Sequence, residues 1–259
     1  MIVDCHTHVQ GLDNDIDKTE HLAAVEPVDV CFVLASGNQS SMQINKILSE
    51  YVNNYRDKMV GFALVNPTED SIRRDDISYL IEKMNLKGIV LYCSEYAFHP
   101  AHSKAMQFYE TAQEMKVPVF FHNEYSNKSS VLNFTQPFLL DEIACSFPDL
   151  KMIIGNMGMP FVEQTLALLH KHDNIYADLT LTPQRVWQVY NIVVSAYEAE
   201  VMEKLLFGSG FPYSKPGECI ETLLGFNKLI ADTNLPRVPR NSIRQVVERD
   251  TLKLLGVEM

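Results

Sequence analysis

Short apolar runs recur along the chain about every 30 residues, the length of one strand–helix step. Eight runs can be counted, at residues 1–8, 28–36, 59–67, 86–93, 117–123, 150–158, 174–182 and 204–212. Most of them are continuous and do not alternate with polar positions, which is typical of strands buried on both faces of a parallel sheet. The pattern therefore predicts eight parallel strands.

The segments between these runs have the periodicity of amphipathic helices. In residues 41–55, for example, Ile44, Leu48 and Tyr51 share one helical face. Residues 9–27 have the least regular pattern and are predicted to form a surface loop. Further helices are predicted from residue 68 and over residues 102–115, 136–145, 161–169, 186–202, 217–230 and 242–255.

Eight strands that alternate with helices predict an α/β fold, the closed (β/α)8 or TIM barrel, with an open doubly wound sheet as the alternative. The 259 residues contain no linker or charge block, so we expect one domain over residues 1–259. In such a barrel the chemistry takes place at the carboxyl ends of the strands. No stretch approaches the roughly 20 apolar residues of a membrane span. A secretory signal is not expected, because Asp4, His6 and His8 interrupt the amino terminus.

Composition and charge narrow the possible partners. Hydrophobic residues make up 46% of the chain and charged residues 21%, as in an ordinary globular protein. The net charge of −11 disfavours contact with phosphate backbones, so we expect a small-molecule substrate or ligand and neither nucleic acid nor membrane as partner. The five cysteines are odd in number and scattered, which indicates reduced thiols in a cytoplasmic protein.

The first predicted strand ends in the sequence Asp4-Cys5-His6-Thr7-His8. Because side chains alternate along a strand, His6 and His8 share one face with Asp4 one layer below. Two imidazoles at this spacing on the inner face of a barrel can bind one cation, and Asp4 can orient a ligand from behind. Two ordinary surface histidines are the alternative, and the position on the first strand of a barrel favours the metal site.

The wider order of segments resembles the amidohydrolase superfamily, and within it the amidohydrolase-2 branch of hydrolases, lactonases and decarboxylases of small carboxylated or aromatic compounds. DCHTH resembles the opening strand of that family, VPVFFHN its fifth strand with a metal-binding histidine, and FPDLKMIIGNMGMP its sixth strand. NIYADLT, KLLFGSGFPY and ERDTLKLLGV resemble its seventh strand, eighth strand and closing helix. The resemblance covers essentially the whole chain. It implies one divalent metal, Zn²⁺, bound by His6, His8 and His122.

Two positions depart from the family pattern. Asn156 stands where the sixth strand usually carries a histidine, and Gly210 stands where the eighth usually carries an aspartate. In the family, that aspartate binds the metal and takes the proton of the attacking water, while the histidine polarises the substrate or completes the metal site. Asparagine can hydrogen-bond a carbonyl but cannot transfer a proton, and glycine can do neither. Three imidazoles still suffice for zinc, so a weakly bound metal and a metal-free site both stay open.

Four further residues near the predicted strand ends are candidates for the site. Tyr92 either contacts substrate or packs as a core aromatic, and His99 either reaches over the site or lies in an exposed loop. Glu124, two residues beyond His122, is a replacement base or ligand, or else a solvated loop acid. Asp178 faces inward and needs a partner, so it is an anchor behind the site or part of a polar core layer. Three other histidines are expected at the surface: His21, His170 and His172.

Two functions are compatible with this pattern. The first is a metal-dependent enzyme that hydrolyses a lactone, amide or ester, or decarboxylates an aromatic acid. Asn156 and Tyr92 then hold the substrate, and Glu124 or Asp178 supplies the base. The second is a non-catalytic descendant that binds a small molecule, for which the missing acid at Gly210 is the main support. A homo-oligomer is compatible with either function.

Overall fold

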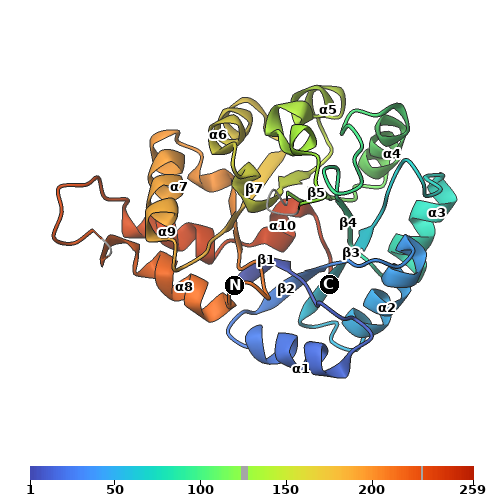
Figure 1. Ribbon diagram of the computed structural model, residues 1–259, viewed down its shortest axis with the longest axis horizontal. Helices are drawn as coiled ribbons and strands as arrows, with labels where there is room; N and C mark the ends of the chain where they lie inside the picture. Colours follow the sequence, from blue (N-terminus) through green and yellow to red (C-terminus); the bar gives the residue numbers. More distant parts are fainter. Residues whose placement is uncertain (124–127, 229) are drawn as a thin grey trace.

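Eight parallel strands, paired in chain order, form the centre of the molecule. The computed structural model describes residues 1–123, 128–228 and 230–259. Figure 1 shows helices arranged around the strands, and this alternation confirms the (β/α)8 barrel and excludes the doubly wound sheet. The strands are β1 (Val3–Thr7), β2 (Val30–Leu34), β3 (Met59–Leu64), β4 (Gly88–Leu91), β5 (Val119–Phe121), β6 (Met152–Ile154), β7 (Ile175–Thr180) and β8 (Leu205–Gly208).

The barrel closes between β1 and the segment that follows β8. Thr7 and Phe211 form an isolated parallel bridge. The amide of His8 donates to the carbonyl of Phe211 at 2.8 Å, and the amide of Gly210 donates to the carbonyl of His6 at 2.9 Å. The barrel is therefore closed by backbone hydrogen bonds of His6, His8 and Gly210, three of the residues singled out by the sequence.

Apart from the first helix, helices follow the strands in the regions where the apolar periodicity predicts them, and the one helix predicted over residues 242–255 is divided into two. They are α1 (Asp15–Ala24), α2 (Ser41–Asn53), α3 (Arg74–Ser78), α4 (Ser103–Glu114), α5 (Asp141–Ser146), α6 (Val162–Lys171), α7 (Val186–Glu198), α8 (Pro216–Leu224), α9 (Arg240–Val247) and α10 (Thr251–Leu255). The helix predicted from residue 68 is shorter than its pattern, and α3 continues into a π-helical turn, Tyr79–Lys83. None of the helices in the described residues has the length and apolarity needed to cross a membrane.

The prediction of a surface loop over residues 9–27 is wrong, because α1 lies within it. The side chain of Asn14 caps this helix by accepting from the amide of Ile16 at 3.0 Å. His21, expected at the surface, is fully buried on α1 and bonds both Tyr51 and Thr7 at 2.9 Å. Burial lowers the pKa of His21 to about 4, so it is a neutral core histidine.

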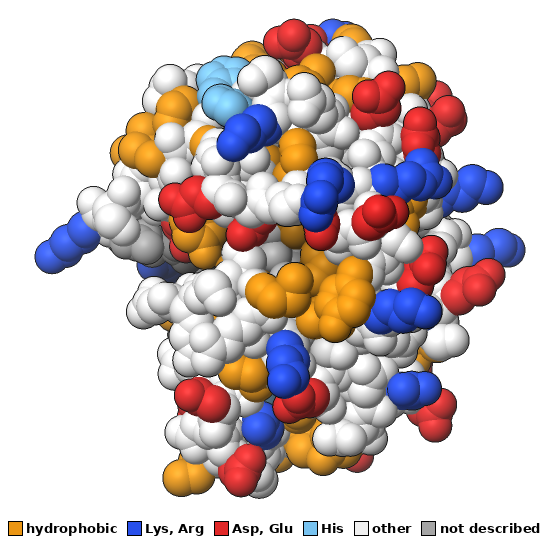
Figure 2. Space-filling model, turned by 90° about the vertical axis from the view of Figure 1, so that its right-hand side faces the viewer, with side chains coloured by type: hydrophobic (Ala, Val, Ile, Leu, Met, Phe, Trp, Pro, Cys, Tyr) orange, Lys and Arg blue, Asp and Glu red, His pale blue; other side chains and the backbone are white. Residues whose placement is uncertain are grey.

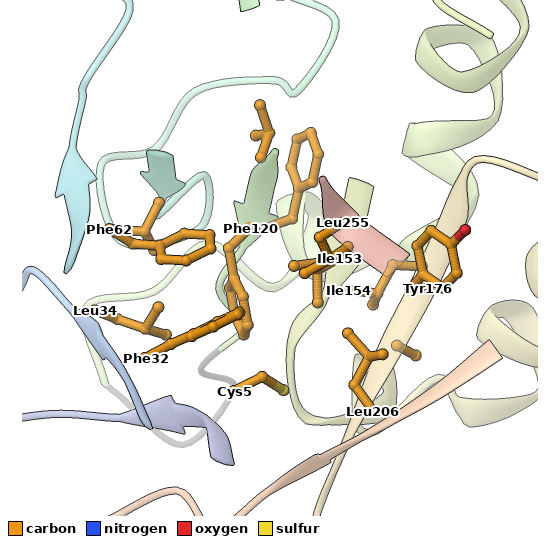
Figure 3. Close-up of a cluster of buried hydrophobic side chains, with 14 of the residues drawn as sticks. Cys5, Phe32, Leu34, Phe62, Phe120, Ile153, Ile154, Tyr176, Leu206 and Leu255 are labelled. Atoms are coloured by element: carbon orange, nitrogen blue, oxygen red, sulfur yellow. The ribbon is translucent and has the colours of Figure 1, made fainter. Parts of the chain in front are cut away.

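The core fills the barrel and the space under the helices. Figure 3 shows Phe32, Phe62 and Phe120 from successive parts of the sheet with Leu255 from the last helix. Phe32 and Phe62 stack with ring centroids 4.9 Å apart, and both are fully buried. The apolar runs are continuous because both faces of each strand are buried: side chains on one face fill the barrel, and those on the other pack against helices.

All five cysteines are free thiols, four of them buried. Burial raises the pKa of the Cys5 thiol well above its usual range, so its side chain is a neutral thiol within the core. On the face shown in Figure 2, Lys and Arg side chains are interspersed with Asp and Glu. That face therefore presents no continuous surface of one charge.

Candidate metal and substrate site

Three histidines converge at the carboxyl end of the barrel. His6 lies near the end of β1, His8 follows that strand, and His122 follows β5. The ring centroids are 5.1 Å apart for His6 and His8, 5.2 Å for His6 and His122, and 5.1 Å for His8 and His122. One ligand nitrogen from each ring lies within 4.8 Å of the others. The structure therefore assembles the three predicted ligands into a near-equilateral group, which we call the histidine trio.

Two nitrogens of the trio face each other closely. Nε2 of His6 lies 3.1 Å from Nε2 of His8. Nδ1 of His8 lies 3.2 Å from the carbonyl of Leu34, which can only accept, so a neutral His8 carries its proton on Nδ1. Burial, with smaller contributions from His6 and His122, holds the pKa of His8 well below its usual range. The lone pair of His8 Nε2 consequently points at His6, and either a proton or a cation has to lie between the two rings.

The spacing suits a tetrahedral cation. Nitrogens at about 2.0–2.1 Å from a tetrahedral zinc lie roughly 3.3 Å from each other. The 3.1 Å between the two Nε2 atoms is close to that value. Neutral imidazoles are also the form that binds metal. The residues present thus fit a divalent cation of the zinc type.

Asp178, near the middle of β7, lies directly behind His6. Its Oδ2 accepts from Nδ1 of His6 at 2.8 Å, and its Oδ1 accepts from the amides of Asn156 and Thr180, each at 3.0 Å. Burial by itself raises the pKa of Asp178, but His6 and these hydrogen bonds outweigh it and hold the pKa below its usual range. Asp178 is fully buried and does not line the cavity. This geometry favours a role for Asp178 in holding the ring of His6 over a role as the general base.

Asp4 supports the backbone of the site and not an imidazole ring. Its Oδ1 accepts from the amide of His6 at 3.1 Å and from the amide of Ser209 at 2.9 Å. Burial raises the pKa of Asp4 to about 6, against the opposing effect of bonds to Ser209 and His6. Asp4 therefore links the end of β1 to the segment after β8. The role predicted for Asp4, to orient a histidine ring, is instead performed by Asp178 on His6.

The two departures from the family pattern both lie in left-handed backbone. Asn156 has φ 51° and Gly210 has φ 66°. A Cβ atom at Gly210 would meet Cγ2 of Thr180 at 2.6 Å, so the fold here requires glycine. Asparagine tolerates this conformation better than most residues. Its side-chain amide donates to the carbonyl of Asn123 at 2.6 Å while the residue lines the cavity.

A cavity of about 760 Å³ opens above the histidine trio. This volume is in the range of small-molecule sites. Tyr92 lines it with its ring tilted against His122, at a centroid distance of 4.5 Å, and its hydroxyl donates to the carbonyl of Ala35 at 3.0 Å. The described lining residues are His6, His8, Gln10, Ser36, Tyr92, Glu95, His122, Asn156, Met159, Thr180, Leu181, Thr182, Arg185, Gln188, Ile192, Ser209, Gly210, Pro212, Tyr213 and Ser214.

Two charged residues of this wall were not among the sequence candidates. Within the described lining, Glu95 is the one carboxylate and Arg185 is the one Lys or Arg side chain. Each lies in a segment directly after a strand, β4 and β7 respectively. The rule that strand-to-helix loops of a barrel carry the chemistry would have selected both segments, although not these side chains within them.

Two sequence candidates do not join the described site. His99 was predicted to contact substrate, and this is corrected by the structure: it is exposed, lies outside the cavity lining, and its Nδ1 accepts from the amide of Ala101 at 3.0 Å. The imidazole of His99 therefore bonds within its own turn and is not part of the described cavity wall. Glu124 lies outside the described residues.

Comparisons with known proteins agree with this geometry. The model of the amidohydrolase family matches residues 3–240. A dihydroorotase of Helicobacter pylori is 23% identical over 188 residues, which cover 69% of this chain and 53% of the relative. The chain thus spans about half the length of the curated relatives that it matches over their longest alignments.

Two solved structures share the fold over nearly the whole chain. A probable 2-pyrone-4,6-dicarboxylic acid hydrolase from Acinetobacter baumannii, with citric acid bound, has a TM-score of 0.70 at 14% identity and covers 98% of this chain and 99% of its own. A dihydroxybenzoic acid decarboxylase from Polaromonas sp., with bound manganese and 2-nitroresorcinol, has a TM-score of 0.64 at 12% identity, covering 98% and 96%. At these identities the likeness concerns the fold. The family match over residues 3–240, joined to this barrel, shows that the chain belongs to the amidohydrolase family.

Proposed function

We propose that this protein is a metal-dependent enzyme that hydrolyses or decarboxylates a small organic acid. The observation that carries the proposal is the histidine trio, with Nε2 of His6 and Nε2 of His8 facing each other at 3.1 Å under a cavity of about 760 Å³. Family relatives include hydrolases and decarboxylases, one of them with manganese bound. Support for the non-catalytic alternative is limited to the glycine at position 210.

His6, His8 and His122 would hold one divalent cation, for which the donor set favours Zn²⁺. Bound there, the cation would polarise a water molecule or a substrate oxygen. Asp178 would keep the ring of His6 in its binding orientation, because it accepts from Nδ1 of that ring. Tyr92 and Asn156 would contact the substrate from the cavity wall.

Arg185 would bind an anionic group of the substrate. It lies on the cavity wall between β7 and α7, and a guanidinium matches a carboxylate in geometry and charge. A small carboxylic acid held at Arg185 would share the cavity with the trio. Glu124 remains a prediction for the general base, and a cytoplasmic location remains a proposal that the five free cysteines support.

The test is an activity screen of the protein loaded with Zn²⁺, Mn²⁺ or Co²⁺ against lactones, cyclic amides and aromatic carboxylic acids. We expect turnover that depends on added metal, is lost in His122→Ala and persists in His99→Ala, a matched histidine outside the cavity. Arg185→Met should raise KM for acids by about tenfold to a hundredfold, in line with loss of a charged hydrogen bond of 1.5–3 kcal/mol. Saturable binding of an acid without turnover in any metal form would support the binding-protein alternative instead.

A further inference from the structure

The third histidine of the trio has a carboxylate beside its Nδ1 atom. Oε1 of Glu95 lies 3.4 Å from Nδ1 of His122. The imidazole side chain is 9% exposed and the carboxylate side chain 26% exposed. Within the described part of the chain, Nδ1 of His122 is a buried polar atom with no formed hydrogen bond. A shift of a few tenths of an ångström in the Glu95 side chain would form one.

The other two histidines show what such a contact does. Nδ1 of His6 is held by the carboxylate of Asp178 at 2.8 Å, and Nδ1 of His8 faces the carbonyl of Leu34 at 3.2 Å. Both acceptors fix the proton on Nδ1 and turn Nε2 toward the centre of the trio. Glu95 is the corresponding acceptor for His122.

Glu95 lies outside the group of ligand atoms itself. The cluster whose atoms lie within 4.8 Å of one another consists of the three imidazoles, in the chain as described, without this carboxylate. Its contact is with Nδ1 of His122, whose ring centroid lies 5.2 Å from that of His6 and 5.1 Å from that of His8. Its place is therefore behind a ligand and not beside the cation.

Charge gives an independent reason for an acid at this position. The usual aspartate of the eighth strand is replaced by Gly210, where the backbone leaves no room for a Cβ atom. A dication bound by three neutral imidazoles then lacks its anionic neighbour. Asp178 supplies one negative charge behind His6, and Glu95 is the one carboxylate on the described cavity wall. Together they balance the two positive charges of the cation.

From these observations we propose that Glu95 is a positioning residue that accepts the Nδ1 proton of His122, fixes its tautomer and compensates for the acid missing at Gly210. This inference rests on the proposed metal site but not on any particular reaction. It predicts that the tautomer of His122 depends on Glu95 even before metal is added.

Long-range ¹H–¹⁵N correlation spectra of the metal-free protein test the tautomer directly. We expect His122 to carry its proton on Nδ1 in the wild type and in Glu95→Asp, and to show mixed tautomers in Glu95→Ala. Glu110→Ala, on the exposed side of α4, is the matched control and should leave the spectrum unchanged. A wild-type His122 protonated on Nε2, or the same tautomer in Glu95→Ala, would overturn the inference.

Affinity for Zn²⁺ and Co²⁺, measured by competition with a chromophoric chelator, is the second readout. Glu95→Ala should weaken binding by about 10- to 100-fold, the usual cost of losing the partner of a metal-bound histidine. Glu95→Gln, which keeps an acceptor but not the charge, should fall between Ala and the wild type. Unchanged affinity in Glu95→Ala, or no binding by the wild type, contradicts the inference. If both readouts respond to Glu95 while no compound is turned over, the inference holds and the proposed reaction fails.

Discussion

Two places in this barrel bring together three side chains of the kind that bind metals, and they differ in how their charges are satisfied. In the histidine trio, the outer nitrogens of His6 and His8 have acceptors while Nε2 of each faces the other. The second group, which we call the outer cluster, consists of Asp141, Cys145 and His172 between α5 and α6.

In the outer cluster the charges are already paired. Both oxygens of Asp141 accept from Nζ of Lys171, at 2.6 and 2.7 Å, and Oδ1 also contacts Nε2 of His172 at 2.6 Å. Nε2 of His172, which would have to bind the metal, is thus already hydrogen-bonded to Asp141. The carboxylate of Asp141 is in turn paired with the ammonium group of Lys171. The comparison teaches that residue types and short distances do not define a metal site. What distinguishes the histidine trio is a set of facing ring nitrogens that are not already paired with a charged group of the chain.

Removal of the trio should have the largest effect. Replacing His6 and His8 by Ala should weaken Zn²⁺ binding by more than the roughly 100-fold expected for a supporting residue, since two direct ligands are lost. Asp141→Ala with Cys145→Ser, in the outer cluster, should leave one equivalent of bound metal. Elemental analysis after dialysis, together with chelator competition, measures both. Loss of metal from the outer-cluster variant but not from the trio variant would reverse the comparison.

Restoring the family's acid should have an intermediate effect and should need a second change. Gly210→Asp alone places a non-glycine residue at φ 66° with its Cβ atom 2.6 Å from Cγ2 of Thr180. Left-handed strain of about 1–3 kcal/mol should lower the melting temperature by several degrees. Thr180→Ser removes that methyl group and keeps the hydroxyl that lies 3.1 Å from Nδ1 of His6.

The double variant, compared with Thr180→Ser alone, should bind Zn²⁺ about tenfold more tightly, or 1.4 kcal/mol, because an anionic ligand is added. Chelator competition measures the affinities, and thermal unfolding separates a folding defect from a binding defect. Equal affinities in a folded double variant would show that the backbone at position 210 cannot direct a carboxylate to the trio.

The outer cluster should show the smallest effect, and it should depend on pH. Hydrogen bonds from Lys171, and then from His172, hold the pKa of Asp141 below its usual value. A carboxyl whose pKa is lower in the folded state stabilises the protein above its unfolded pKa of about 3.9, and this stabilisation is lost as the pH falls through the folded value. Because the side chain of Asp141 is 38% exposed, solvent screening limits its contribution to under about 1 kcal/mol at neutral pH.

Asp141→Asn should therefore be slightly less stable than the wild type at pH 7, and the difference should shrink at pH 3. Urea unfolding at the two pH values measures it. A difference well above 1 kcal/mol at pH 7, or one that grows in acid, would show that Asp141 has a role beyond the surface ion pairs.

Sequence patterns predicted more of the ligands than of their supports. His6 and His8 are recognisable because alternation along one strand puts them on one face, whereas His122 was identified through the resemblance of its segment to the family's fifth strand. The departures at Asn156 and Gly210 are likewise visible only against the family pattern. Glu95 was passed over, since a carboxylate in a strand-to-helix loop acquires meaning only from the ring that it contacts.

Local pattern also failed where burial depends on distant partners. His21 was predicted at the surface because its own segment is polar, with Asp15, Asp17 and Glu20 nearby. In the fold it is covered by Thr7 and Tyr51, which lie 14 and 30 residues away in the chain. A helix hidden in a polar segment with a weak apolar face was missed for a related reason, because α1 gains its stability from that packing.

The sequence by itself determined the barrel and the pairing of His6 with His8, because strand and helix periods are local properties of the chain, and the family resemblance added His122. Tertiary structure alone decided which carboxylate stands behind which ring. Asp178 is 172 residues from His6 and Glu95 is attached to a different strand from His122, so no local spacing relates them. The same holds for the glycine at position 210, which is required by its left-handed backbone and by the methyl group of Thr180 on the neighbouring strand. Such neighbours decide which ring nitrogen of each histidine carries a proton. The proton positions in turn distinguish a metal site from a set of paired charges.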